Sequence, residues 1–216
     1  MPTKPEPRMT KIRGIAAFDL DGTLLRGATV CEVLAKPLGR LQEMERFEGF
    51  SEESDIAFAR AEMARWYSGS AIADLTVHLR HAEWAPGARE CVRQLQSEGI
   101  EVALVSVTWS FAVRWFAGQL NISYYLGTEL FPSGQIGHVW GRDKARFVRD
   151  LACTSEVPFQ RVAAIGDSRG DIEMLNEARL QFFVGRTLPY QSDAFIHLPQ
   201  ADLRLVAERI LQEWAA

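Results

Sequence analysis

The chain has 216 residues, a length that allows one core domain of roughly 150 residues and a smaller second module. Its residues are 47% hydrophobic and 24% charged, which is typical of a globular protein whose core needs neither disulfides nor structural metals. The formal net charge of -4 argues against nucleic acid or an anionic membrane surface as a partner, because no basic excess exists to neutralise phosphates.

The N-terminal segment, residues 1–11, contains three prolines and no apolar stretch. We therefore expect a disordered leader there rather than a signal peptide. No apolar run approaches the ~20 residues that are needed to cross a bilayer. Cys31, Cys91 and Cys153 are far apart and form no CxxC pair, so neither a zinc knuckle nor a dithiol redox motif is indicated. We expect a cytoplasmic protein with reduced thiols and no membrane partner.

A buried strand is predicted over residues 12–19, where a short apolar run stops at an acidic turn. Residues 27–84 have a different character, with charge, helical periodicity and no convincing strand, and they predict a small helical domain inserted after the first strand. We expect residues 12–26 and 85–216 to form one α/β core domain.

Helical and strand patterns alternate from residue 86 to the end of the chain. Helices are predicted over 86–99, 111–120, 141–152, 170–178 and 201–214, strands over 100–106, 124–130, 161–167 and 181–185, and a short hairpin over 133–141. This alternation implies βαβ units and a doubly wound parallel sheet with helices on both faces. Ligands of such folds bind beyond the carboxyl ends of the strands, so functional residues are expected directly after strands.

Two carboxylates that are two residues apart, Asp19 and Asp21, follow the first strand, and Gly22 and Thr23 continue the turn. One carboxylate of such a pair can attack phosphorus while the other gives a proton to the leaving group. An ordinary acidic turn explains the same residues when they are taken alone.

Three further positions have the chemistry of a phosphate site. Ser106 ends a predicted strand, where its hydroxyl can hold a phosphoryl oxygen or begin a helix cap. Lys144 can balance clustered carboxylates, although most lysines are solvated at the surface. Asp167 and Asp171 follow another strand and offer oxygen ligands for a hard cation such as Mg²⁺. A helix cap accounts for Asp171 but not for both aspartates.

The ordered set resembles the four motifs of the haloacid dehalogenase superfamily. The DxDGT of residues 19–23, the apolar strand that ends in Ser106, Lys144, and the GDxxxD of residues 166–171 carry this resemblance. It implies a Rossmann-like core and a Mg²⁺-dependent phosphatase that hydrolyses a small phosphomonoester through an aspartyl-phosphate intermediate.

The same resemblance implies a role for each motif residue. It implies that Asp19 is the nucleophile and Asp21 the general acid and base, that Ser106 and Lys144 bind phosphoryl oxygens, that Mg²⁺ is held by Asp19, the backbone carbonyl of Asp21 and Asp167, and that Asp171, Gly22 and Thr23 support the site. Since the dehalogenase branch lacks the acid at the position of Asp21, dehalogenation is not expected.

The helical insertion lies between the first and second motifs, as the helical cap does in the phosphoserine phosphatase branch. Those enzymes carry a glutamate after the first motif that binds the substrate amine, whereas here Ala28 stands at that position and Glu32 comes one helical turn later. Val107 and Thr108 replace the usual glycine pair, and Gly170 replaces the usual asparagine. These departures argue against phosphoserine itself as the substrate.

Several residues in or near the insertion are candidate substrate contacts. They are Glu32, Arg60, Arg65, Trp66, Tyr67, His78, His81, Val107, Thr108 and Trp109, and for the residues within helices packing is the simpler explanation. A phosphotransferase or phosphomutase that uses the same phospho-aspartate is the alternative function, and a catalytically inactive protein that binds a phosphate ligand is another. The expected partner is a small phosphorylated metabolite, and a monomer or a homodimer would fit the sequence.

Overall fold

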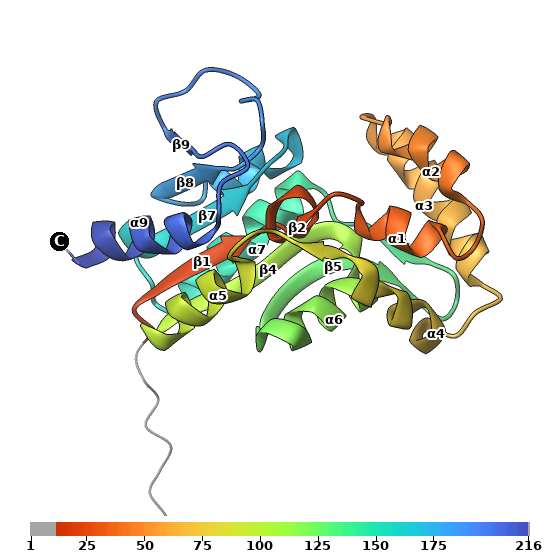
Figure 1. The fold of residues 1–216 in the computed structure, drawn as a ribbon, viewed down its shortest axis with the longest axis horizontal. Helices are drawn as coiled ribbons and strands as arrows, with labels where there is room; N and C mark the ends of the chain where they lie inside the picture. Colours follow the sequence, from red (N-terminus) through yellow and green to blue (C-terminus); the bar gives the residue numbers. More distant parts are fainter. Residues whose placement is uncertain (1–11, 216) are drawn as a thin grey trace, which may run out of the picture.

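A seven-stranded sheet forms the centre of the protein (Figure 1). The structure, a computed structural model, describes residues 12–215, so the predicted leader lies outside the described residues. In spatial order the strands are β6 (Ile136–Gly137), β5 (Tyr124–Leu130), β4 (Ile100–Trp109), β1 (Gly14–Phe18), β7 (Val162–Gly166), β8 (Leu180–Phe183) and β9 (Phe195–His197). Every neighbouring pair is parallel except β5 and β6, which confirms the predicted parallel α/β sheet.

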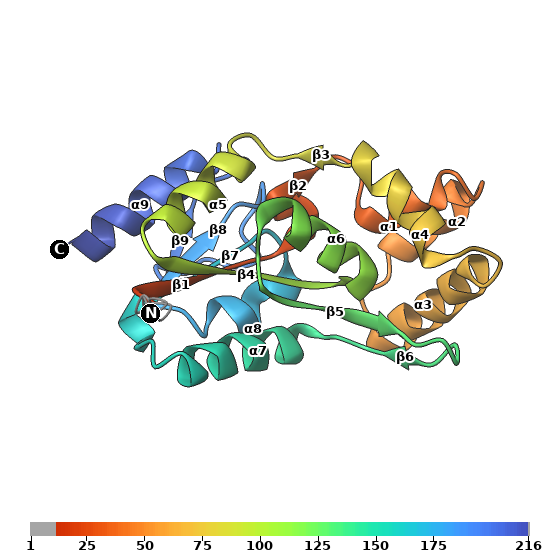
Figure 2. The ribbon, with the colours of Figure 1, turned by 90° about the horizontal axis from the view of Figure 1, so that it is seen from below.

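Helices cover both faces of this sheet, as predicted (Figure 2). One face packs against α5 (Ala88–Ser97), α6 (Ser110–Leu120) and α9 (Arg204–Ala215), and the other against α7 (Gly141–Thr154) and α8 (Ile172–Leu175). Because side chains of a strand alternate between faces, Ala16 and Phe18 enter the first core and Ile15 and Ala17 the second. All four are fully buried, as expected for a central parallel strand.

The segment between β1 and α5 is mostly helical. Its helices are α1 (Val30–Ala35), α2 (Leu41–Glu48), α3 (Glu53–Tyr67), α4 (Ile72–Thr76) and the 3₁₀ turn η2 (Val77–His81). The expectation of no strand in 27–84 is wrong at its end, because β3 (Glu83–Trp84) pairs antiparallel with β2 (Leu25–Arg26). Leu34, Met44 and Met63 of this segment belong to the same apolar cluster as the α5 face of the sheet.

Irregular turns connect the sheet to the site. A π-helical turn, η1 (Leu20–Leu24), follows β1, and η3 (Phe159–Arg161) and η4 (Arg169–Asp171) flank β7. The predicted hairpin forms between the end of β5 and β6, whereas β9 was not predicted. Within residues 12–215, no helix has both the length and the hydropathy of a membrane span.

Candidate active site

Asp19 is held at the end of β1 by a buried ammonium. Lys144 Nζ, from the first turn of α7, lies 2.7 Å from Asp19 Oδ1 and also donates to Asp171 Oδ1. Asp19 is 5% exposed, and Lys144 and Asp171 are 1% exposed each, so this is not the solvated lysine of the usual case. Since Oδ1 of Asp19 accepts from Lys144, its Oδ2 is the oxygen left for other chemistry.

Asp171 organises the turn that follows β7. Its Oδ2 accepts from the backbone N–H groups of Asp167 and Ser168, each at 3.0 Å, and from Ser168 Oγ at 2.9 Å. Gly166 makes room for this side chain, since a Cβ on Gly166 would lie 2.5 Å from Asp171 Cβ. Both oxygens of Asp171 are therefore engaged by the protein, which makes it a positioning carboxylate rather than a free ligand.

Asp167 faces the turn after β1 directly. Thr23 Oγ1 donates to Asp167 Oδ1 at 3.3 Å. Gly22 has a φ of +79°, and a Cβ there would lie 2.1 Å from Asp167 Oδ2. The glycine is thus required both for its left-handed backbone and for the close approach of the two strand ends.

Asp21 has the environment of a group that exchanges protons near neutral pH. Its Oδ1 accepts a 2.8 Å hydrogen bond from the backbone N–H of Val30, the first residue of α1. Burial raises the pKa of Asp21 to about 7, with the Val30 hydrogen bond opposing the shift and the charges of Glu48 and Asp167 adding to it. A general acid and base functions best when its pKa lies close to the working pH.

The carboxylate cluster carries more negative charge than Lys144 can balance. Burial and the charge of Asp171 raise the pKa of Asp19, against the opposing effect of Lys144. Burial and Asp171 also raise the pKa of Asp167 to about 6. Burial disfavours the charge on Lys144, but the two carboxylates outweigh it and raise its pKa. The cluster is therefore suited to a further cation.

Ser106 lies on β4, next in the sheet to β1. It is 1% exposed, and its Oγ accepts from the backbone N–H of Thr108 at 3.3 Å. The strand does not end at Ser106 as predicted, because β4 continues to Trp109 with a register irregularity after Val105. This bulge turns Val107 and Thr108 toward the cavity.

A cavity of about 490 Å³ brings most of the predicted residues together. Its wall includes Asp19, Asp21, Gly22, Arg60, Ser106, Val107, Thr108, Lys144, Asp167 and Asp171 from the predicted set. The remaining wall comes from Gly27, Thr29, Cys31, Met44, Phe47, Glu48, Phe50, Ile56, Ala59, Met63, Ser168 and Gly170. Thr23 does not line the cavity but contacts Asp167 from behind.

Seven predicted substrate contacts are placed elsewhere. Trp109 is 1% exposed and packs edge-on against Tyr67, at a ring-centroid distance of 5.7 Å, so it does not border the cavity. Glu32 does not line it either, because its carboxylate turns back to accept from the backbone N–H of Thr29 at 2.7 Å and caps α1. Arg65, Trp66, Tyr67, His78 and His81 are likewise absent from the cavity wall.

Arg60 extends from α3 into the cavity wall and connects α3 to the core by hydrogen bonds. Its Nη2 donates to the carbonyl oxygens of Val107 and Val139 at 2.9 and 3.1 Å, and Nη1 lies 3.2 Å from His138 Nδ1. The guanidinium stacks 4.6 Å from the centroid of Trp140. Burial lowers the pKa of Arg60 to about 10, because carbonyl groups rather than a carboxylate contact the charge.

Glu48 is a cavity residue that the sequence did not single out. Its Oε1 accepts from Thr29 Oγ1 at 2.7 Å, which brings α2 against the start of α1. Burial raises the pKa of Glu48, and the neighbouring charge of Glu32 adds to the shift. Within the sequence Glu48 is one of many acidic residues on a polar helix, so only the spatial arrangement distinguishes it.

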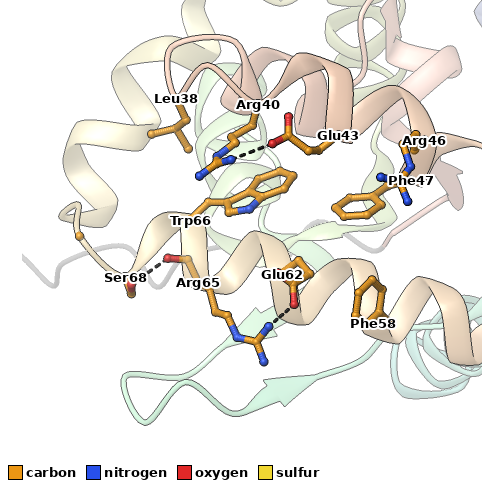
Figure 3. Close-up of a pocket in the computed structure, with 11 residues that line it drawn as sticks. Leu38, Arg40, Glu43, Arg46, Phe47, Phe58, Glu62, Arg65, Trp66 and Ser68 are labelled. Atoms are coloured by element: carbon orange, nitrogen blue, oxygen red, sulfur yellow. Dashed lines mark hydrogen bonds and ion pairs between the residues drawn. The ribbon is translucent and has the colours of Figure 1, made fainter.

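A second, larger hollow of about 740 Å³ lies between α2 and α3 and contains none of the motif residues (Figure 3). Trp66 and Phe47 stack there with ring centroids 5.5 Å apart. Arg40 pairs with Glu43 at its edge, and Arg65 pairs with Glu62. Its charged groups thus largely satisfy one another, and we assign it no chemistry.

The donor set of the first cavity fits a hard divalent cation. Oxygen atoms of Asp19, Asp167 and Asp171 lie within 4.8 Å of one another. Since Lys144 and the β7 turn engage both oxygens of Asp171, Asp19 and Asp167 supply the free carboxylate oxygens. Few carboxylates, with further positions left for backbone oxygen, water and substrate, are what Mg²⁺ prefers.

The model of the haloacid dehalogenase-like hydrolase family matches residues 16–176, and the chain belongs to this family. The chain is 28% identical to the phosphoserine phosphatase of Archaeoglobus fulgidus over 82% of its own length and 54% of that protein. It is 26% identical to phosphoserine phosphatase SerB2 of Mycobacterium tuberculosis over 89% of its length and 49% of that protein. The chain thus spans about half the length of these two relatives.

Other relatives are of similar size to this chain. The phosphoserine phosphatase of Methanocaldococcus jannaschii is 24% identical over 94% of this chain and 100% of that protein. Among solved structures, a phospho-aspartyl intermediate analogue of phosphoserine phosphatase superimposes with a TM-score of 0.74 at 20% identity, covering 91% of this chain and 98% of that one. The chain therefore shares the fold of that phosphoserine phosphatase structure.

Proposed function

We propose that this protein is a Mg²⁺-dependent phosphatase that hydrolyses a small phosphomonoester through an aspartyl-phosphate on Asp19. The observation that carries the proposal is the position of Asp19 in the wall of the cavity, with one oxygen fixed by Lys144. Family membership and the names of the relatives support the same class of reaction.

In the first half-reaction, a carboxylate oxygen of Asp19 attacks phosphorus and the bond between phosphorus and the ester oxygen breaks. Asp21 gives its proton to the departing alkoxide, for which a pKa of about 7 is well suited. In the second half-reaction, Asp21 takes a proton from water while the water oxygen bonds to phosphorus. The bond between phosphorus and Asp19 then breaks, which releases phosphate and restores both carboxyl groups.

The surrounding residues position the phosphoryl group and reduce charge repulsion. The Ser106 hydroxyl and the Lys144 ammonium hold its oxygens, and Lys144 also neutralises part of the charge on Asp19. Asp19, Asp167 and the backbone carbonyl of Asp21 would hold Mg²⁺, which supplies the positive charge that lets a carboxylate approach an anionic ester. We also propose that residues 27–84 form a helical cap domain that covers the cavity.

The cavity wall favours a leaving group that resembles an amino acid. Ala28 argued against phosphoserine, but Glu48 brings a carboxylate to the neighbouring Thr29 from a different helix. Arg60 offers a buried positive charge that no carboxylate neutralises. A substrate with one ammonium and one carboxylate group would complement both, and phosphoserine is such a molecule, as the names of the relatives also suggest.

Phosphate release from phosphoserine in the presence of Mg²⁺ tests the reaction, with Asp19→Asn as the altered protein. We expect the rate to fall by about 10⁴-fold or more, because the variant has lost its nucleophile. Release that persists in this variant would contradict the proposed mechanism. Phosphopeptide mass analysis after acid quench should detect a phosphoryl group on the wild-type protein only.

Glu48→Gln tests the substrate preference. We expect KM for phosphoserine to rise by about tenfold, the effect of losing one charge-assisted contact. KM for phospholactate, which has a hydroxyl-derived ester and a carboxylate but no amine, should stay unchanged. Glu45→Gln, on the same helix but outside the cavity, is the matched control. Equal effects on both substrates would exclude an ammonium-binding role.

A further inference from the structure

Arg26 is a charged residue beside the carboxylate cluster that the proposed reaction does not use. Arg26 is the last residue of β2, where the chain leaves the core for the helical segment (Figure 1). In the β2–β3 ladder it lies opposite Glu83 of the returning strand β3. Its side chain turns back toward the sheet, and Nη1 donates to the carbonyl oxygen of Gly22. Nη2 is buried and has no hydrogen-bond partner.

The guanidinium lies within electrostatic range of Asp167 without contacting it. Gly22, whose carbonyl oxygen accepts a hydrogen bond from Arg26 Nη1, connects the two side chains. Asp167 and Gly22 are themselves in close approach. Arg26 therefore lies behind the Asp167 side of the cluster, outside the cavity wall.

The position matters because the cluster must bind ions of both signs. Within residues 12–215, Lys144 pairs directly with Asp19 and Asp171, whereas Asp21 and Asp167 have no direct ion pair. A divalent cation is attracted by an excess of carboxylates, whereas a phosphate group is repelled by it. A fixed positive charge that does not contact the carboxylates weakens their attraction for the divalent cation and reduces their repulsion of the phosphate group.

We infer that Arg26 is a positioning residue whose charge beside the Asp167 side of the cluster weakens the binding of the divalent cation and strengthens the binding of phosphate. The inference rests on the proposed function, since it takes Asp167 as a ligand of the cation. It gives Arg26 a role that its hydrogen bond to Gly22 would not need, because a neutral donor could make that bond as well.

The test compares Arg26→Gln, which keeps a hydrogen-bond donor but loses the charge, with Arg26→Lys, which keeps the charge. Mn²⁺ affinity is measured by electron paramagnetic resonance in the absence of substrate. Binding of inorganic phosphate is then measured by calorimetry at saturating Mg²⁺. Neither measurement depends on turnover, and circular dichroism establishes that each variant is folded.

We expect Arg26→Gln to bind Mn²⁺ about tenfold more tightly and phosphate about tenfold more weakly, as for one unit charge acting on an ion several ångströms away. Arg26→Lys should stay within about twofold of wild type for both ions.

Weaker Mn²⁺ binding in Arg26→Gln, or equal changes in the Gln and Lys variants, would overturn the inference and leave Arg26 as a tether for the Gly22 turn. A wild-type protein that binds no Mn²⁺ would overturn the proposed metal dependence together with this inference, so the two failures are distinguishable.

Discussion

Without a metal ion, the carboxylate of Asp167 should make the protein less stable as the pH rises. Its folded pKa of about 6 lies above the ordinary value of 3.8, mainly because the group is buried and because Asp171 is close. The folded chain therefore keeps the proton to a higher pH than the unfolded chain does. By linkage, the free energy of unfolding falls between about pH 4 and the folded pKa.

The magnitude follows from the size of the shift. A difference of about two pKa units corresponds to about 3 kcal/mol, at 1.36 kcal/mol per unit. Asp167→Asn removes the titrating group and keeps a side chain of the same size. The advantage of wild type over this variant should thus decline by about 3 kcal/mol between pH 4 and pH 8.

Urea unfolding in the presence of a chelator, repeated across this pH range for both proteins, provides the measurement. The comparison reports Asp167 together with its effect on Asp19 and Asp21, whose pKa values its charge raises, because carboxylates outside the cluster contribute equally to both proteins. Adding Mg²⁺ should reverse the trend, since a cation that binds the ionised carboxylates stabilises the folded state most at high pH. A wild-type advantage that is constant or grows with pH in chelator would refute this reasoning.

Two more predictions concern the turn after β1. Asp21→Asn should lower the rate of aspartyl-phosphate formation, measured by acid quench during the first turnover, by about 10²–10⁴-fold with an alkyl phosphate and far less with p-nitrophenyl phosphate, whose leaving group needs no proton. Equal losses on both substrates would argue against Asp21 as the general acid. Gly22→Ala should lower the free energy of unfolding more than Gly39→Ala does, by urea denaturation. Both glycines have positive φ, about 1–3 kcal/mol of strain for alanine, but only Gly22 would clash with Asp167. Equal losses would show that this contact is unimportant.

The sequence was most informative where local pattern and three-dimensional position coincide. Asp19 and Asp167 directly follow buried apolar strands, and parallel neighbouring strands end at one edge of the sheet. An apolar strand followed directly by an aspartate, found twice, therefore predicts that Asp19 and Asp167 lie close together. The seven-stranded order is harder to derive, because β9 is three residues long and β6 only two, too short for a periodic signal.

The residues that sequence reasoning missed or misplaced depend on contacts between distant segments. Trp109 follows Ser106 closely, but the strand continues through a bulge and turns the indole into the core. Glu48 becomes a cavity residue only because α2 folds back onto Thr29. Arg26 resembles any polar residue at the end of a short strand, and only the structure places its guanidinium on the carbonyl oxygen of Gly22.

The pairing of β2 with β3 places the exit and the return of the chain side by side. Leu25 lies opposite Trp84 and Arg26 opposite Glu83. The chain therefore enters and leaves the intervening helices at this one short two-stranded ladder. The ladder holds the two ends of the helical segment at a fixed separation, whatever the length of chain between them. In evolution the helices, and substrate recognition with them, can therefore change while the sheet and its reactive carboxylates keep their geometry.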